Sequence, residues 1–145
     1  MISEFHASTI IEVSVSFGFT EFSCDPSVIT ATLGVEPDII TIAGAPRVLK
    51  SGHEVKTPHS TWCIRSGIIS KDVNDHLRDL LLQIQSMNNS FSKDWGEPFF
   101  NVLWKSNYLY AGNGPYYEPD VLSEIGKLNC AIYQDIYQVD SESEE

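Results

Sequence analysis

Residues 22–37 read FSCDPSVITATLGVEP and carry the start and stop signals of one short helix. The carboxylate of Asp25 can accept a hydrogen bond from a free N–H group of the first helical turn, so this residue suits the N-cap. Pro26 fits the first helical position, where its missing N–H group has no consequence. Gly34 favours the left-handed conformation that follows many helices, and Pro37 prevents a restart. The stretch therefore predicts a short helix that begins at Pro26 and must be held by packing.

The segment before it, residues 10–20, alternates apolar side chains with polar or small ones, as a strand with one buried face does. One face would carry Ile11, Val13, Val15, Phe17 and Phe19, and the other Glu12, Ser14, Ser16 and Gly18. The β-branched and aromatic content agrees with a strand. We expect the helix that begins at Pro26 to pack on the apolar face.

The rest of the chain reads as further strands and helices. We expect strands at 38–42, 61–66, 99–105, 107–111 and 130–138, and helices at 72–87 and 119–129. The strands at 99–105 and 107–111 would form a hairpin that turns near Ser106. Residues 44–60, which contain several glycines and prolines, are interpreted as a long loop or an irregular hairpin.

This order of elements predicts one α+β domain over residues 1–139. Its architecture would be a two-layer sandwich, with a mixed, mostly antiparallel sheet and three helices on one face. Residues 140–145 would form an acidic disordered tail.

The chain has 145 residues and a formal net charge of −11, from 20 acidic and 9 basic residues. Such a charge repels nucleic acids and anionic membranes and favours encounter with a basic protein. No secretion signal opens the sequence, and no apolar run approaches the roughly 18 residues of a membrane span. The three cysteines, Cys24, Cys63 and Cys130, are widely spaced, so we expect reduced thiols. Together these features predict a cytoplasmic protein that binds neither nucleic acid nor membrane.

Several short motifs resemble those of one bacterial family. They are the stretch at residues 22–37, Ser60-Thr61-Trp62 at the start of a strand, the helix around His76-Leu77, and Asp135-Ile136-Tyr137 in the last strand. This set is similar to a domain of unknown function numbered 4279, and the likeness spans nearly the whole body of the chain. The resemblance implies a compact α+β domain in a bacterial cytosol. It brings no established activity.

A set of tyrosines and charged residues can share the sheet face that points away from the core. Its members are Glu12 and Ser14 in the first strand, Arg65 in the second, and Tyr133, Asp135 and Tyr137 in the last. Tyrosines mixed with charges suit protein recognition, because the ring provides a large contact area and keeps a polar group. The alternatives are a solvated face, tyrosines that complete the edge of the core, and a carboxylate pair of Glu12 and Asp135 for acid–base chemistry.

The segment at 44–60 offers an alternative site, because long structured loops often carry function. A pocket between this segment and the sheet, lined by Arg47, His59 and Trp62, would bind a small molecule. His59 with a nearby acid would alternatively allow hydrolysis. The sequence has no G-x-S-x-G nucleophile motif, no phosphate loop with its lysine and no paired zinc-ligand spacing, so we expect neither metal nor cofactor.

These observations favour a non-enzymatic protein-binding domain. In its most specific form, the hypothesis is an immunity protein that neutralises a toxin of the nuclease type by occluding its active site. Acidic charge would speed association with a basic toxin surface. The alternative is a small-molecule-binding or regulatory domain with its ligand under residues 44–60.

Overall fold

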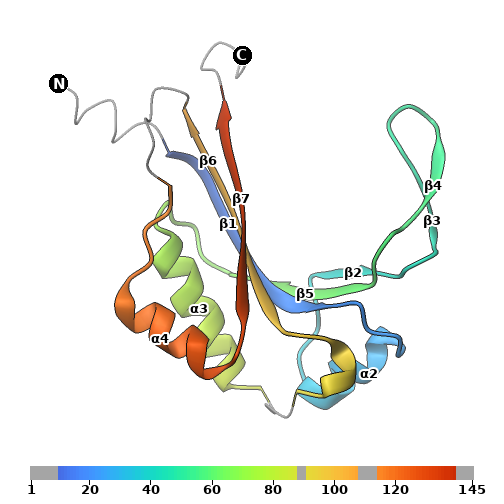
Figure 1. The fold of residues 1–145 in the computed structure, drawn as a ribbon, viewed down its shortest axis with the longest axis horizontal. Helices are drawn as coiled ribbons and strands as arrows, with labels where there is room; N and C mark the ends of the chain where they lie inside the picture. Colours follow the sequence, from blue (N-terminus) through green and yellow to red (C-terminus); the bar gives the residue numbers. More distant parts are fainter. Residues whose placement is uncertain (1–9, 88–90, 108–113, 140–145) are drawn as a thin grey trace.

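The computed structural model describes residues 10–87, 91–107 and 114–139, and it contains a five-stranded sheet in the order β2-β5-β1-β6-β7 (Figure 1). The strands are β1 (Ile10–Thr20), β2 (Ile39–Thr41), β5 (Thr61–Arg65), β6 (Phe99–Asn107) and β7 (Ala131–Val139). β6 and β7 run parallel, and the other neighbouring pairs are antiparallel. The predicted mixed, mostly antiparallel sheet is therefore confirmed.

Three helices lie on one face of this sheet: α2 (Pro26–Leu33), α3 (Val73–Gln85) and α4 (Pro119–Lys127). α2 has the predicted ends, because the Asp25 carboxylate accepts a hydrogen bond from the Ser27 N–H group at 2.9 Å and Gly34 has a φ of 73°. The Trp62 indole of β5 donates to the Thr30 hydroxyl group at 3.0 Å and so joins α2 to the sheet. The expected α+β sandwich is confirmed.

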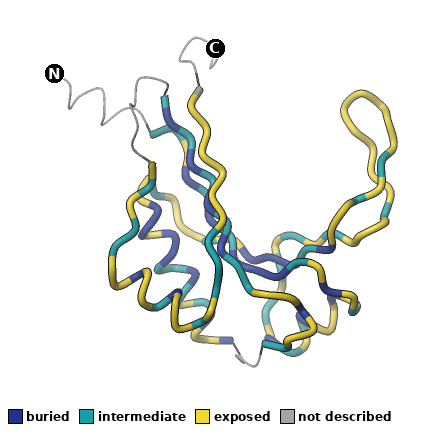
Figure 2. The backbone as a smooth tube through the Cα atoms, in the orientation of Figure 1, coloured by how far each residue is buried: buried dark blue, intermediate teal, exposed yellow. Residues whose placement is uncertain are grey.

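One hydrophobic cluster lies between the helices and the sheet. Figure 2 marks the buried residues along the chain in dark blue. Its fully buried members on the sheet include Val15, Phe17, Phe19, Trp62, Ile64, Phe100 and Val102. The 3-10 helix η1 (Lys93–Trp95) adds Trp95, whose ring lies 5.2 Å from that of Phe19 in an edge-on contact. α3 and α4 contribute Leu77, Leu80, Val121 and Ile125. The alternation predicted for residues 10–20 is confirmed from Val13 to Phe19, whose odd-numbered side chains face this cluster. It is wrong at Ile11, because a register shift between Ile10 and Glu12 places Ile10 against the cluster instead.

The hairpin expected at 99–111 is wrong. β6 continues without a turn to Asn107, and Ser106 is fully buried within it, opposite Ile10 of β1 and Gln138 of β7. The polar run from Lys105 to Asn107 suggested a turn. The strand instead keeps its alternation there, and its two long neighbours hold it straight. The rest of the second expected strand falls in 108–113, outside the described residues.

Residues 46–56 form a two-stranded arm, in which β3 (Pro46–Val48) pairs with β4 (Glu54–Lys56). Backbone hydrogen bonds of 2.8 Å that join Thr57 to Gly44 and Ala45 hold its base. Figure 1 shows the arm extending away from α3 and α4. The expected tail at 140–145 lies outside the described residues. Among the helices of the described ranges, none has the length and apolarity that a membrane crossing requires.

Candidate functional site

The six residues predicted for partner binding all lie on the sheet face opposite the helices. The register places Arg65, Ser16, Asn101 and Tyr133 in one row across the sheet, Ser14, Leu103 and Asp135 in the next, and Glu12, Lys105 and Tyr137 in a third. Side chains in one row point to the same face. We call this surface the open face and define it by the residues of these three rows.

Polar and aromatic contacts link the strands across the open face. Lys105 Nζ lies 3.4 Å from Glu12 Oε1, and the Asn101 amide donates to the Asp135 carboxylate at 3.3 Å. The ring of Tyr133 contacts that of Phe99, just beyond the first row, edge-on at 5.7 Å. These contacts orient the side chains and leave them accessible to a partner.

The two tyrosines of the open face remain half exposed, at 57% for Tyr133 and 50% for Tyr137. They do not complete the core edge, which was one alternative interpretation. The charges of the face balance, with Glu12 and Asp135 against Arg65 and Lys105. A partner would therefore meet two aromatic rings among charges of both signs.

The β6 residues of the open face were not predicted from the sequence. Asn101 and Lys105 lie between the first and last strands and form the contacts described above. The alternation of β6 could have indicated them, because Asn101, Leu103, Lys105 and Asn107 share one face. The expected turn at Ser106 hid this pattern.

The structure does not bring Arg47, His59 and Trp62 together. Trp62 is fully buried on the helix-covered face, where its indole group is already bonded to Thr30. Arg47 is exposed on the arm, and the exposed imidazole of His59 contacts the Glu21 carboxylate through Nδ1. No side of Trp62 is left for a ligand, so a pocket shared by these three side chains does not form.

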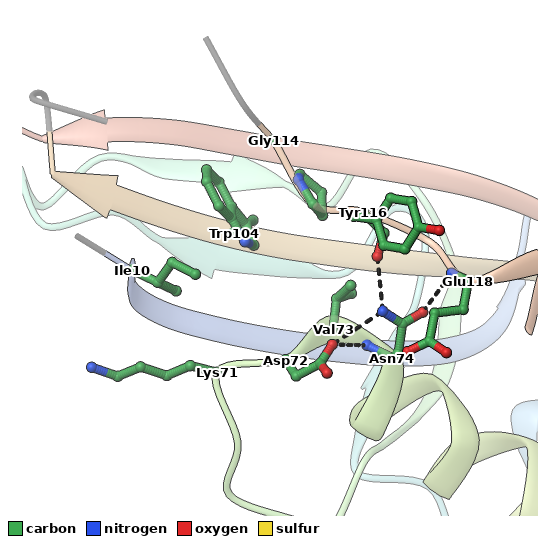
Figure 3. A pocket seen from close by; sticks show the side chains of 10 residues that line it. Ile10, Lys71, Asp72, Val73, Asn74, Trp104, Gly114, Tyr116 and Glu118 are labelled. Carbon is green, nitrogen blue, oxygen red and sulfur yellow. Dashed lines mark hydrogen bonds between the residues drawn. The ribbon is translucent and has the colours of Figure 1, made fainter. Parts of the chain in front are cut away.

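A cavity of about 310 Å³ lies where the first turn of α3 meets β1, β6 and the segment at 114–118 (Figure 3). Its wall includes the buried Asn74, which ties α3 to that segment. The Asn74 amide nitrogen donates to the Tyr116 carbonyl at 2.8 Å, and its oxygen accepts from the Glu118 N–H group at 2.9 Å. Lys71 and Trp104 also line the cavity. The polar groups of Asn74 serve to join elements.

A buried histidine that the sequence reasoning did not assign holds the loop before α3. His76 is 3% exposed, and its two ring nitrogens contact the Ser66 hydroxyl group and, at 2.7 Å, the Ser70 carbonyl oxygen. Since a carbonyl oxygen only accepts, Nε2 donates to Ser70. Both nitrogens are thus engaged in fixing the loop, and no local sequence signal marks this role.

Burial controls the ionisation of the thiols. Desolvation raises the pKa of Cys63 and of Cys130 to about 12, so both are thiols at neutral pH and poor nucleophiles. Burial likewise raises the pKa of Tyr117 to about 12. Within the described ranges, no group of three His, Cys, Asp or Glu side chains is placed to hold a metal ion.

Comparison with known proteins places this chain in one family. No curated protein and no solved structure matches it. The sequence profile of a domain of unknown function (DUF4279) matches residues 11–139. Because this match covers most of its length, the chain belongs to the DUF4279 family.

Proposed function

We propose that this protein is a non-enzymatic binding domain that recognises another protein through the open face. The observation that carries the proposal is a sheet surface with half-exposed Tyr133 and Tyr137 among charged side chains, on the side opposite the helices. Protein interfaces are enriched in tyrosine, which offers contact area with few rotatable bonds.

Ordered contacts on the open face favour recognition of a defined surface. Asp135 is held by Asn101, and Glu12 by Lys105. Side chains that are positioned before binding lose less conformational entropy when a partner docks. The face therefore has pre-positioned charges as well as aromatic anchors.

The overall charge favours a partner with a basic surface. The face itself is balanced, but the chain carries −11, so the long-range field accelerates the approach of a cation-rich protein. A nucleic-acid-cleaving toxin fits this description, because its substrate is polyanionic. The specific form of the proposal is an immunity protein that covers such an active site in a bacterial cytoplasm.

The test compares two variants that change the net charge equally. Asp135→Lys alters the open face, whereas Asp94→Lys alters an exposed carboxylate on η1, on the helix side. Tagged wild-type protein and both variants are used to capture partners from the source cells, and the dissociation constant for the captured protein is then measured. We expect Asp135→Lys to weaken binding at least tenfold and Asp94→Lys less than threefold.

Two results would contradict this proposal. Equal weakening by both variants would attribute binding to net charge alone, and a contact surface mapped to the helix side would remove the open face. If the captured protein is a nuclease, stoichiometric addition of the wild-type chain should abolish its activity. Unchanged nuclease activity would reject the immunity role.

A further inference from the structure

The last strand of the sheet is exposed on both of its faces. Every residue from Tyr133 to Gln138 is exposed, including those on the face that the helices cover elsewhere (Figure 2). Ile136 is 46% exposed on that helix-covered side, and Tyr133 and Tyr137 flank it on the open face. β7 is also the terminal strand of the sheet. It therefore presents two faces and one edge to its surroundings.

The free edge of β7 offers a regular row of backbone groups. The Ala131 N–H group donates to the Pro98 carbonyl, which places the N–H and C=O groups of the odd-numbered β7 residues toward β6. Those of Ile132, Gln134 and Ile136 consequently point outward. Among the described residues they have no backbone partner, so this edge can accept another strand.

β7 lacks the features that usually block edge pairing. Its sequence, AIYQDIYQV, has no lysine and no proline, and its register with β6 is continuous from Ala131 to Val139. Its one charge is Asp135. The edge is thus long, regular and nearly uncharged.

We propose that β7 pairs with β7 of a second copy of this chain, which would join the two sheets into one. Two identical strands that pair in antiparallel fashion are related by a two-fold axis. Each possible register is therefore defined by the residue that lies at this axis, opposite the same residue of the second copy. A register centred on Asp135 would oppose two carboxylates and is unfavourable.

A register centred on Gln134 places Tyr133 opposite Asp135 and Ile132 opposite Ile136, each pair occurring twice. The tyrosine hydroxyl group is a donor and the carboxylate an acceptor, and the isoleucines join two apolar side chains. Charge and polarity therefore select this pairing over the one centred on Asp135. This inference does not depend on the proposed function, since it concerns the backbone edge of β7 and no other protein, although Tyr133, Asp135 and Tyr137 also belong to the open face.

The available area predicts a weak, concentration-dependent dimer. The exposed parts of Tyr133 and Tyr137 amount to roughly 100 Å² each, from 57% and 50% of a ring residue that buries 150–250 Å² in full. The contact of two copies would bury these tyrosine side chains, Ile136 and the strand backbone. Its total buried area stays below the roughly 1,200 Å² of a standard stable interface.

Sedimentation velocity of the full chain, from about 10 μM to 1 mM, tests the dimer. The variant Ile136→Lys puts a charge on the edge, and Ile69→Lys is its control, because Ile69 is a fully exposed isoleucine in the loop before α3. We expect wild type and Ile69→Lys to dimerise alike and Ile136→Lys to raise the dissociation constant at least tenfold. Thermal melting checks that both variants fold.

Two further measurements use chains with an unaltered edge charge. Hydrogen exchange of the Gln134 and Ile136 amides in wild type should slow as the concentration rises. Gln134→Cys should form a disulfide-linked dimer under oxidation, because Cα atoms about 5.5 Å apart in a hydrogen-bonded pair lie within the disulfide range. Wild type with its three cysteines is the control.

A chain that sediments as a monomer up to 1 mM would overturn the proposal. A dimer insensitive to Ile136→Lys, with no slowing of amide exchange at Gln134, would place the contact elsewhere and would also overturn it. Protection of these amides only by a different protein would assign the edge to that protein instead of a second copy.

Discussion

The sheet accommodates only glycine at position 18, because a larger residue would clash with β5. An added Cβ would lie 1.9 Å from the Trp62 carbonyl oxygen and 2.8 Å from Cys63 Cα, both backbone atoms of β5. Backbone cannot give way as a flexible side chain can, so the two strands would have to separate. The close approach of β1 to β5 at this point therefore depends on glycine.

We predict that Gly18→Ala lowers the free energy of unfolding by about 3 kcal/mol, at the upper end of the usual cost of overpacking. Urea unfolding followed by circular dichroism measures this change. The matched control is Gly126→Ala in α4, where nothing lies within 4 Å of the added Cβ. That change should raise stability by about 0.5–1 kcal/mol, because alanine favours helix. Similar losses in both variants would reject the clash.

Residue-level placement followed from the sequence where it depended on alternation alone. Glu12 and Ser14 share a face because successive side chains of a strand point to opposite sides. Trp62 was misassigned to a ligand pocket for a different reason. It faces α2 because it lies opposite Phe19 of β1, and this register is set by contacts between distant segments. Local spacing holds no information about such a register.

At the scale of elements, the buried amide of Asn74 links α3 to the segment before α4, beside the exposed ion pair of Arg78 with Glu118. Asn74 is 3% exposed and satisfies the Tyr116 carbonyl and the Glu118 N–H group, which lie more than 40 positions further along the chain. Removing the amide would leave two part-buried backbone groups without these partners, at a cost of about 1 kcal/mol or more for each group.

Asn74→Ala should therefore lower the free energy of unfolding by about 2–3 kcal/mol in denaturant titrations. Gln85→Ala, at an exposed position near the end of the same helix, should change it by less than about 0.5 kcal/mol. Hydrogen exchange should also show faster opening of α4 in Asn74→Ala. If both variants lose the same stability, the link from α3 to α4 is not what Asn74 provides.

The elements with strong local signals were predicted well, and those that depend on neighbours were not. α2 has its own cap and its own terminal glycine, so its ends could be read directly. The polar residues around Ser106 predict a turn that would end β6 there. Its course is instead decided by pairing with β1 and β7 on both sides. The position of β7 at the edge likewise depends on strand order, which alternation does not reveal.

At the scale of the whole molecule, the net charge follows directly from the amino-acid composition, and folding changes it little. The chain carries −11, and its ion pairs are exposed, as the side chains of Arg78 and Glu118 show at 40% each. Exposed pairs contribute little to stability. General repulsion among the acids should therefore outweigh local attraction at low salt.

We predict that the melting temperature rises by a few degrees between 10 mM and 150 mM NaCl at pH 7. Over this range the screening length falls from about 30 Å to about 8 Å, so the acids repel one another less. A gain of about 1 kcal/mol corresponds to roughly 3 °C for a chain of this size. Differential scanning calorimetry at a protein concentration of a few micromolar, where a weak dimer would be dissociated, measures the effect.

Near pH 4.6, the isoelectric point, the net charge approaches zero, so the salt-dependent rise in melting temperature should shrink. A melting temperature that falls with added salt at pH 7 would mean that the ion pairs dominate, and the largest contribution should then come from the Arg78 pairs between α3 and the start of α4.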